Sequence, residues 1–145
     1  MSDSSKPSAE TIVKHMLQHD AFSQWLGIEL IDVKEGACTL KCTLTDKMLN
    51  GYKIAHGGII FSLADSAIAF ASASYGRLTV AIDHSISFTK KAVSGDALTV
   101  KAKALSMKFK TGVIHVDITN QHDELIAVIK GTVYRKSEEF NLQKI

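Results

Sequence analysis

The chain has little of what marks several classes of protein. Its 145 residues include one proline and two cysteines, and 17 basic side chains stand against 15 acidic ones. No uncharged apolar run reaches the roughly 18 residues that a membrane-spanning helix needs. The N-terminal stretch also lacks the apolar core of a signal peptide. These absences argue against a disordered, collagen-like, membrane or secreted protein, and we expect one globular domain in the cytoplasm.

The two cysteines do not indicate a disulfide. Cys38 and Cys42 are four positions apart in a segment with strand-like alternation, which places them about 13 Å apart on one face. A disulfide cannot span that distance. We expect two small buried thiols in a reducing compartment.

Motifs for metals, nucleotides and serine nucleophiles are also missing. None of the six histidines stands at a ligand-type spacing from cysteine or carboxylate. The sequence has no GxGxxG, Walker or GxSxG motif. We therefore expect no bound metal.

One stretch is strongly basic. Between Ser85 and His115 six lysines stand against one acid, Asp96, for a local formal charge of +5. This stretch is either a solvated sheet face or a patch for a polyanionic ligand. Nucleic acid is a poor fit because no aromatic residues are interleaved, so a phosphorylated small molecule is the better candidate. The six lysines are Lys90, Lys91, Lys101, Lys103, Lys108 and Lys110.

Hydrophobic periodicity divides the chain into short elements. Helical spacing predicts a helix over residues 9–18, and Asp20 offers an N-cap for a shorter one that ends before Gly27. From Ile28 the period becomes two, which predicts strands over residues 28–33, 38–44, 79–88, 97–105, 111–119 and 125–134. We expect a tail and short helix over residues 1–20, disordered at Met1 to Pro7, then a domain over residues 21–135 and a frayed tail over residues 136–145.

The segment from Ile59 to Tyr75 predicts one long helix. It contains no proline or glycine, and it is apolar or small on nearly every side, so it must be buried. Its alanines and serines allow a sheet to approach closely. The predicted fold is therefore α+β, with a curved antiparallel sheet wrapped around one long central helix.

Asp65 is the only carboxylate between Ile54 and Gly76. A charge in the middle of a buried helix is costly unless it is paired or faces a wet cleft. Asp65 is therefore either a structural residue that bonds a backbone group or a general base with access to substrate. The residues upstream favour the general base.

His56, Gly57 and Gly58 lead into this helix, so the amides of Gly57, Gly58 and Ile59 are predicted to be unpaired donors at the positive end of the helix dipole. Such donors suit an oxyanion or a phosphate. His56 either orders the turn or acts as a base, and Asn50 is at least a turn former.

Spacing predicts that the site is shared between two chains. Gly57 and Asp65 are eight residues apart, about 12 Å along a helix, which is too far for both to act on one carbonyl. We therefore expect a homodimer with antiparallel central helices. Asp83 and His84 are adjacent on a strand and point to opposite faces, so we do not expect them to act as a pair on one substrate.

The run NGYKIAHGGIIFSLADSA, from Asn50 to Ala67, closely resembles the signature of hotdog-fold acyl-CoA thioesterases of the phenylacetate-degradation PaaI type. Residues 110–113 and 119–121 resemble the same family, and the resemblance covers residues 22–133. It implies a hotdog fold and hydrolysis of an acyl-CoA to a free acid and CoA. CoA is then part of the substrate and no cofactor is needed.

The resemblance also implies catalytic roles. The backbone at Gly57 and Gly58 polarises the thioester carbonyl, and Asp65 of the facing subunit activates water or attacks directly. Asn50 holds the thioester or the water, and His56 supports the loop.

Other positions are implied to contact the substrate. In relatives the stretch matching residues 106–112 contacts CoA, which assigns Lys108 and Lys110 to phosphates. Some relatives carry serine or threonine at the position of Ala81, so it stays open whether Asp65 works alone. The substrate-contacting residues expected from these considerations are Phe61, Ala81, Asp83, Lys108, Lys110, Thr111 and Gly112.

Several questions stay open. The acyl group is either an aryl-acetyl or a medium-chain fatty one, and the family resemblance implies a dimer of dimers. A hotdog dehydratase or hydratase of 3-hydroxyacyl thioesters is an alternative enzyme, because it would use a histidine and an acid on the same fold. A non-catalytic acyl-CoA-binding module is a further alternative, with Asp65 structural.

Overall fold

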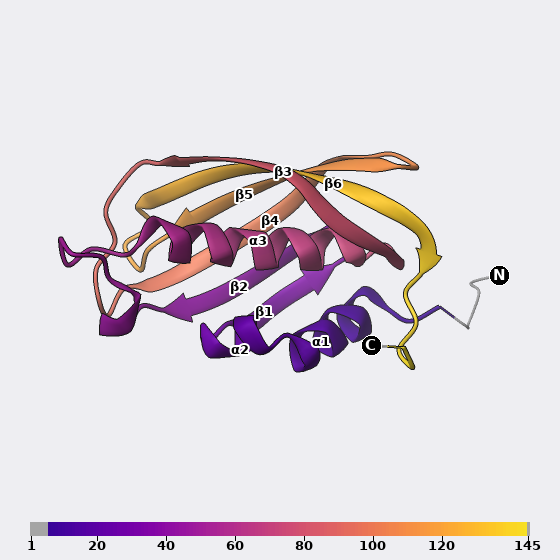
Figure 1. Cartoon of the computed structure of the whole chain (residues 1–145), viewed down its shortest axis with the longest axis horizontal. Coiled ribbons are helices and arrows are strands. Elements are labelled where there is room, and N and C mark those ends of the chain that lie inside the picture. Colours follow the sequence, from indigo (N-terminus) through magenta and orange to yellow (C-terminus); the bar gives the residue numbers. More distant parts are fainter. Residues whose placement is uncertain (1–5, 145) are drawn as a thin grey trace.

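A six-stranded antiparallel sheet curves around one long helix in the computed structural model, which describes residues 6–144 (Figure 1). The strand order is β1-β2-β4-β5-β6-β3. This arrangement confirms the predicted architecture. The strands are β1 (Glu29–Lys34), β2 (Ala37–Thr43), β3 (Arg77–Phe88), β4 (Ala97–Met107), β5 (Thr111–Thr119) and β6 (Leu125–Glu139). The helices are α1 (Ala9–His19), α2 (Ala21–Trp25) and α3 (Gly57–Ala73), with a 3-10 turn at Asp46–Met48.

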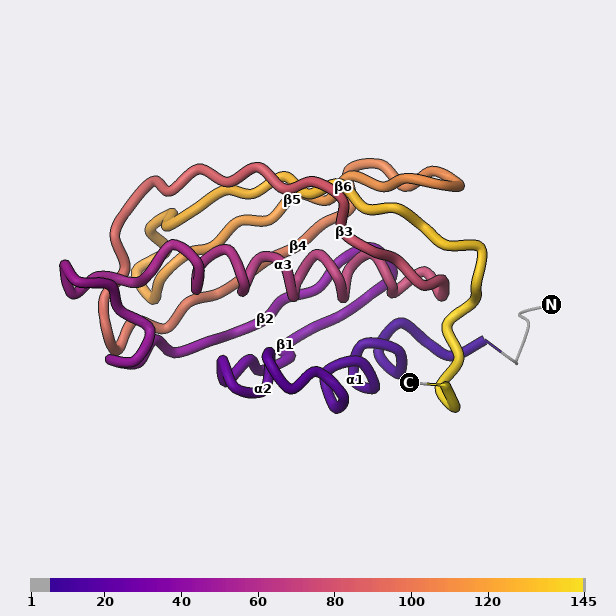
Figure 2. The backbone as a smooth tube through the Cα atoms, viewed as in Figure 1, coloured from indigo at the N-terminus to yellow at the C-terminus, as the bar shows by residue number. Residues whose placement is uncertain are grey.

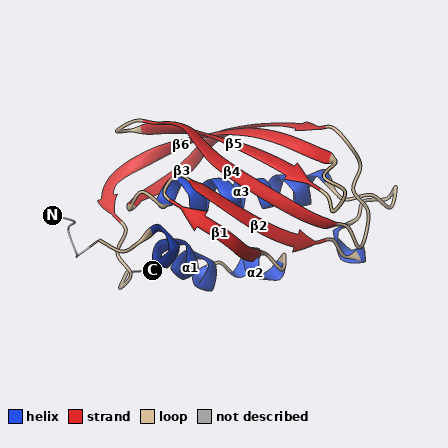
Figure 3. Cartoon of the chain, turned by 180° about the vertical axis from the view of Figure 1, so that it is seen from behind, coloured by secondary structure: helices blue, strands red, loops and turns tan. Residues whose placement is uncertain are grey.

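Helix α3 lies against the concave face of the sheet, and seen from behind the strands cross in front of it (Figure 3). Alternate residues of β2, β4 and β5 are buried against it, as the period of two predicts. Small residues of α3, among them Ala64, Ala67 and Ala71, are fully buried, so the sheet can approach the helix closely. The helix is therefore the centre of the core.

The helix begins and ends two residues earlier than predicted, at Gly57 and Ala73. The start moves because His56 serves as the N-cap. The end moves because Ser74 is the C-cap, and Gly76 follows with a φ of +97°, which a glycine adopts without strain.

The first and last described segments, which lead into α1 and out of β6, lie near each other at the end of the molecule where α3 finishes (Figure 2). The prediction of a frayed tail after Arg135 is wrong for its first part, because β6 continues to Glu139 and pairs with β3. Phe140 is then buried against Ile12 and Ala73, which anchors the segment that follows. The disorder predicted for Met1 to Pro7 falls largely outside the described residues.

Strand β3 is an edge of the sheet and carries a β-bulge. Within residues 6–144 it pairs only with β6. The register changes between Ala81 and Asp83, so Ile82 is an extra residue with no partner of its own. Val80 and Ile82 of this strand are 44% and 59% exposed. The edge is therefore long, apolar and unpaired.

Two further features of the described residues bear on the expectations above. Cys38 and Cys42 are free and buried on β2. In the region from residue 6 to residue 144, no helix is long and apolar enough to cross a membrane.

Candidate active site

His56 determines the geometry at the start of α3. Its Nδ1 accepts the N–H of Gly58 at 2.8 Å, and its carbonyl accepts the N–H of Ile59 at 2.9 Å. Its own N–H donates to the carbonyl of Met48 at 2.8 Å. His56 therefore orders this turn, because its side chain and its backbone both bond the first turn of the helix.

Gly57 is the residue whose amide is left available. The prediction of three unpaired amides is wrong for Gly58 and Ile59, since His56 occupies both. The Gly57 N–H has no partner among residues 6–144. A Cβ at Gly57 would lie 3.1 Å from Cζ of Phe88, so a side chain here would press on that ring. Glycine therefore leaves this amide open to an incoming group.

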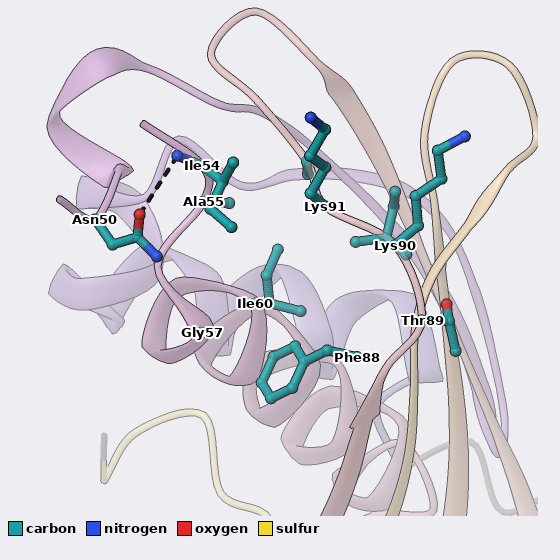
Figure 4. A pocket seen from close by; sticks show the side chains of 11 residues that line it. Asn50, Ile54, Ala55, Gly57, Ile60, Phe88, Thr89, Lys90 and Lys91 are labelled. Carbon is teal, nitrogen blue, oxygen red and sulfur yellow. Dashed lines mark hydrogen bonds between the residues drawn. The ribbon is translucent and has the colours of Figure 1, made fainter. Parts of the chain in front are cut away.

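Asn50 offers a second donor beside Gly57. Its Oδ1 accepts the N–H of Tyr52 at 2.9 Å and that of Ile54 at 3.4 Å. Two backbone donors fix the orientation of the amide group, and its nitrogen points toward the start of α3 (Figure 4). This nitrogen has no bonding partner within the described chain. Asn50 is therefore both a turn former and a free donor.

A cleft of about 360 Å³ opens next to these two donors (Figure 4). Asn50 and Gly57 line it together with apolar side chains, and Lys90 and Lys91 extend away from α3 at its rim. Lys90 forms an ion pair with Glu124. The cleft combines an apolar interior with two hydrogen-bond donors. The apolar lining residues are Ile54, Ala55, Ile60, Phe88, Ala92 and Ile126.

Asp65 lies in the middle of α3 and is paired with a histidine. His84 Nε2 is 2.7 Å from Asp65 Oδ1. The His84 side chain is 5% exposed, whereas that of Asp65 is 51% exposed. Asp65 is therefore held on one side by a buried ring and open to solvent on the other.

The bulge at Ile82 explains why His84 faces the helix. Thr79 lies before the bulge and bonds Ser72 of α3 at 2.8 Å, so it points inward. From Thr79, strict alternation would turn Ala81 and then Asp83 inward. The extra residue shifts the phase by one, so His84 points inward in place of Asp83. Asp83 is exposed and bonds the His84 ring only through its backbone carbonyl, at 2.7 Å.

Sequence reasoning missed the pairing of His84 with Asp65. It considered His84 only with its neighbour Asp83, and a bulge cannot be located from alternation alone. Gly131, in the middle of β6, is the available signal, because glycine inside a strand often marks a close approach. It pairs with His84 in the sheet, and a Cβ there would lie 2.8 Å from the His84 Nδ1.

The expected substrate contacts do not gather in one place within a single chain. Phe61 is on α3 with its ring 5.5 Å from that of His84, and Ala81 is on the exposed β3 edge. Lys108 and Lys110 are in the β4–β5 turn, at the opposite end of the molecule from Gly57 (Figure 1). Thr111 and Gly112 begin β5 at that same end.

The six lysines of the basic stretch likewise do not form one patch. Lys90 and Lys91 border the cleft, and Lys101 and Lys103 are exposed on β4. Lys108 and Lys110 belong to the distant turn.

Comparison with known proteins identifies the family. The model of the thioesterase superfamily matches residues 52–127. The acyl-coenzyme A thioesterase PaaI of Escherichia coli K12 is 38% identical over 120 residues, which cover 83% of this chain and 86% of that protein. The structure of the E. coli PaaI protein matches with a TM-score of 0.90 and 35% identity, covering 92% of this chain and 96% of that one.

The chain belongs to the thioesterase superfamily. It is an enzyme of the thioester hydrolase class, and its predicted resemblance to PaaI-type hotdog proteins is confirmed.

Two more distant structures contain coenzyme A or its acetyl ester. A thioesterase-like protein of Streptococcus pneumoniae TIGR4 was solved with coenzyme A and matches with a TM-score of 0.81 and 27% identity, over 86% of this chain and 98% of that one. The smu.793 protein of Streptococcus mutans UA159, bound to acetyl CoA, matches with a TM-score of 0.76 and 28% identity, over 78% and 91%. The S. pneumoniae protein was also solved as two variants, with an aspartate or a threonine replaced by alanine.

Proposed function

We propose that this protein hydrolyses an aryl- or medium-chain acyl-CoA to the free acid and CoA. The observation that carries the proposal is the pair of free donors, the Gly57 N–H and the Asn50 amide nitrogen, at the mouth of an apolar cleft. Two donors that converge at a helix N-terminus suit a thioester oxygen as it gains negative charge. The apolar cleft suits an acyl group.

The reaction follows from these groups. Asp65 removes a proton from water while the water oxygen attacks the carbonyl carbon, and the carbonyl oxygen becomes an oxyanion on Gly57 and Asn50. The C–S bond then breaks, and the CoA thiolate takes up the proton that Asp65 received. The alternative in which Asp65 attacks directly would form an acyl anhydride that water then hydrolyses.

The two halves of the site come from different subunits in this proposal. Gly57 and Asp65 are on the same helix, about 12 Å apart along its axis, and Asp65 does not line the cleft that contains Gly57. A long apolar edge such as β3 is a liability unless it is covered. Pairing β3 with its counterpart about a two-fold axis covers Val80 and Ile82. It also sets the two α3 helices antiparallel, so that the Gly57 of one chain faces the Asp65 of the other.

The same dimer accounts for the distant lysines. The β4–β5 turn lies at the end of the molecule where α3 finishes (Figure 1), so two-fold symmetry would bring it to the end at which its partner's α3 begins. Lys108 and Lys110 are then available for the phosphates of a CoA whose acyl group occupies the partner's cleft. Thr111 and Gly112 would border the same CoA. Pairing of two such dimers into a tetramer remains part of the proposal.

Replacement of Asp65 by asparagine is the direct test. Asparagine keeps the size of the side chain but cannot accept a proton from water, so kcat should fall about 10²- to 10⁴-fold. The measurement is thiol release from phenylacetyl-, hydroxybenzoyl-, hexanoyl- and palmitoyl-CoA, with circular dichroism to confirm folding. Unchanged turnover in the folded variant would overturn the assignment, and the preferred acyl group in the wild type defines the substrate.

The pairing of Asp65 with His84 favours one second candidate. A dehydratase or hydratase of 3-hydroxyacyl thioesters needs a histidine and an acid in the same site, and the distance of 2.7 Å supplies such a pair. Hydration of an enoyl-CoA would identify this activity. It is measured as a loss of the enoyl-CoA absorbance without release of a thiol. Binding of CoA esters with neither reaction would identify a binding module.

A further inference from the structure

We propose that His84 is a positioning residue, which holds the carboxylate of Asp65 in the orientation that hydrolysis needs. The inference rests on the proposed function, because it assigns His84 a role through Asp65. It concerns the contact between β3 and α3, away from the cleft that contains Gly57.

The hydrogen bonds of the ring define its task. Nδ1 is 2.7 Å from the carbonyl oxygen of Asp83, and Nε2 is 2.7 Å from Oδ1 of Asp65. A carbonyl oxygen only accepts, so Nδ1 donates to Asp83, and Nε2 is the ring atom that shares a hydrogen bond with the carboxylate. The ring is thus anchored to the backbone on one side and bonded to the carboxylate on the other.

The two oxygens of the Asp65 carboxylate differ in their hydrogen bonding. The His84 side chain is 5% exposed and that of Asp65 is 51% exposed, so the carboxylate that the buried ring bonds is itself accessible to water. Within the described residues, Oδ2 has no hydrogen-bond partner. His84 therefore fixes one oxygen and leaves the second oxygen free to take a proton from water.

Three features of the chain orient, accommodate or cover the His84 ring. The bulge at Ile82 turns His84 toward α3. Gly131 of β6 makes room for it, since a Cβ there would lie 2.8 Å from Nδ1 and 2.6 Å from Cδ1 of Ile68. Phe61, one turn before Asp65 on α3, covers the ring at a centroid distance of 5.5 Å. A surface histidine that met an aspartate by chance would not need all three.

The role also fits the residue at position 81. In the S. pneumoniae relative the substituted aspartate and threonine are 16 positions apart, which is the separation of Asp65 and Ala81 here. Alanine has no hydroxyl group and offers the carboxylate no hydrogen bond. The histidine three residues further along the strand supplies the partner that alanine lacks.

The test compares three substitutions of His84 with a matched control. His84→Ala removes the partner, His84→Asn is too short to reach Asp65, and His84→Gln places an amide donor near the position of Nε2. The control is His115→Gln, because His115 makes a similar bond to Asp117, at 2.9 Å, on the outer face of β5.

We expect the alanine and asparagine variants to lose about 10- to 100-fold in kcat with KM nearly unchanged, as partners that orient a reacting group typically do. His84→Gln should recover most of the rate, and His115→Gln should match the wild type. Adding His84→Ala to Asp65→Asn should cost little more than Asp65→Asn alone, because both act through one carboxylate.

The outcomes separate the two proposals. Wild-type kcat in folded His84→Asn, together with an inactive Asp65→Asn, would overturn the role of His84 and leave the hydrolase intact. A rise in KM with kcat unchanged would also overturn the role of His84, and so would full additivity of the two substitutions in the double variant. Full activity of Asp65→Asn would overturn the proposed function itself. If His84→Ala does not fold, the asparagine and glutamine variants still test the positioning role of His84.

Discussion

At the scale of single residues, the chemistry depends on which polar groups are already occupied. Gly57 and Gly58 are equivalent in the sequence motif, but the ring of His56 bonds the amide of Gly58 and leaves that of Gly57 free. The amide group of Asn50 is likewise only partly occupied, because its oxygen accepts hydrogen bonds from the loop and its nitrogen has no partner in the described chain. The donors of the candidate site are therefore one amide and one side chain, in place of two adjacent amides.

Burial makes a prediction for the two thiols. It raises the pKa of the Cys38 thiol to about 12 and also raises the pKa of Cys42. Only the thiolate reacts with disulfide reagents, so at pH 8 we expect Cys38 to react at least about 10²-fold more slowly than free cysteine, and Cys42 also to react more slowly. The measurement is labelling with Ellman's reagent in the native state and in guanidinium chloride. Rapid native labelling of either thiol would contradict its burial.

At the scale of elements, one inserted residue decides which side chain enters the site. Without the bulge at Ile82, Asp83 would face α3 and two carboxylates would meet. With it, His84 faces Asp65, and Gly131 on the neighbouring strand leaves the space. A sheet can therefore exchange the chemistry that it presents to a helix without changing its strand order.

The turn before β4 makes an element-scale prediction about pH. A hydrogen bond from the Gln121 side chain, at 2.9 Å, and one from the Val93 N–H hold the pKa of Asp96 below its usual range. A lowered carboxyl pKa stabilises the fold above the unfolded pKa of about 4, and this contribution is lost as pH falls through the folded pKa.

We expect Asp96→Asn to lower the free energy of unfolding by about 1 kcal/mol at pH 7, because an amide cannot accept both bonds on its two atoms. The difference from the wild type should shrink as pH falls below about 4. Urea unfolding at pH 7 and pH 3 measures it. Asp123→Asn, an exposed acid in the nearby turn, is the control, and an equal loss at both pH values would contradict the prediction.

At the scale of the whole molecule, the proposed site needs residues of two chains. The cleft with Gly57 and Asn50 and the pair of Asp65 with His84 lie on different parts of one chain, and β3 leaves a long edge unpaired in the described structure. The proposed two-fold axis would bring the cleft of one chain to the Asp65–His84 pair of the other, and it would also cover the β3 edge.

Mixing two inactive variants tests the shared site. One subunit carries Asp65→Asn and the other Gly57→Ala, whose Cβ would press on Phe88. Random pairing makes half the dimers mixed, each with one intact site, so about one quarter of the wild-type activity should return. Mass spectrometry must show that subunits exchange. No recovery after demonstrated exchange would contradict a shared site, and each variant mixed with itself is the control.

Much of the fold could be predicted from the sequence. The change of period at Ile28 separates helix from strand, and the long apolar helix between Gly58 and Gly76 has to be buried. The main error in extent, the frayed tail after Arg135, arises because Phe140 finds a buried position against Ile12 and Ala73. The contact of Phe140 with Ile12 joins residues more than a hundred positions apart, which local composition does not reveal.

The sequence by itself determined the central helix, the antiparallel sheet around it, the family signature and the carboxylate at position 65. These depend on local spacing, because periodicity and helix-start residues act over a few positions. Tertiary structure alone decided which amide stays free and that His84 is the partner of Asp65. The first depends on the loop that carries His56, whose N–H bonds Met48 and whose ring folds back onto Gly58. The second depends on a bulge in β3, a strand that packs against α3 from a different part of the chain.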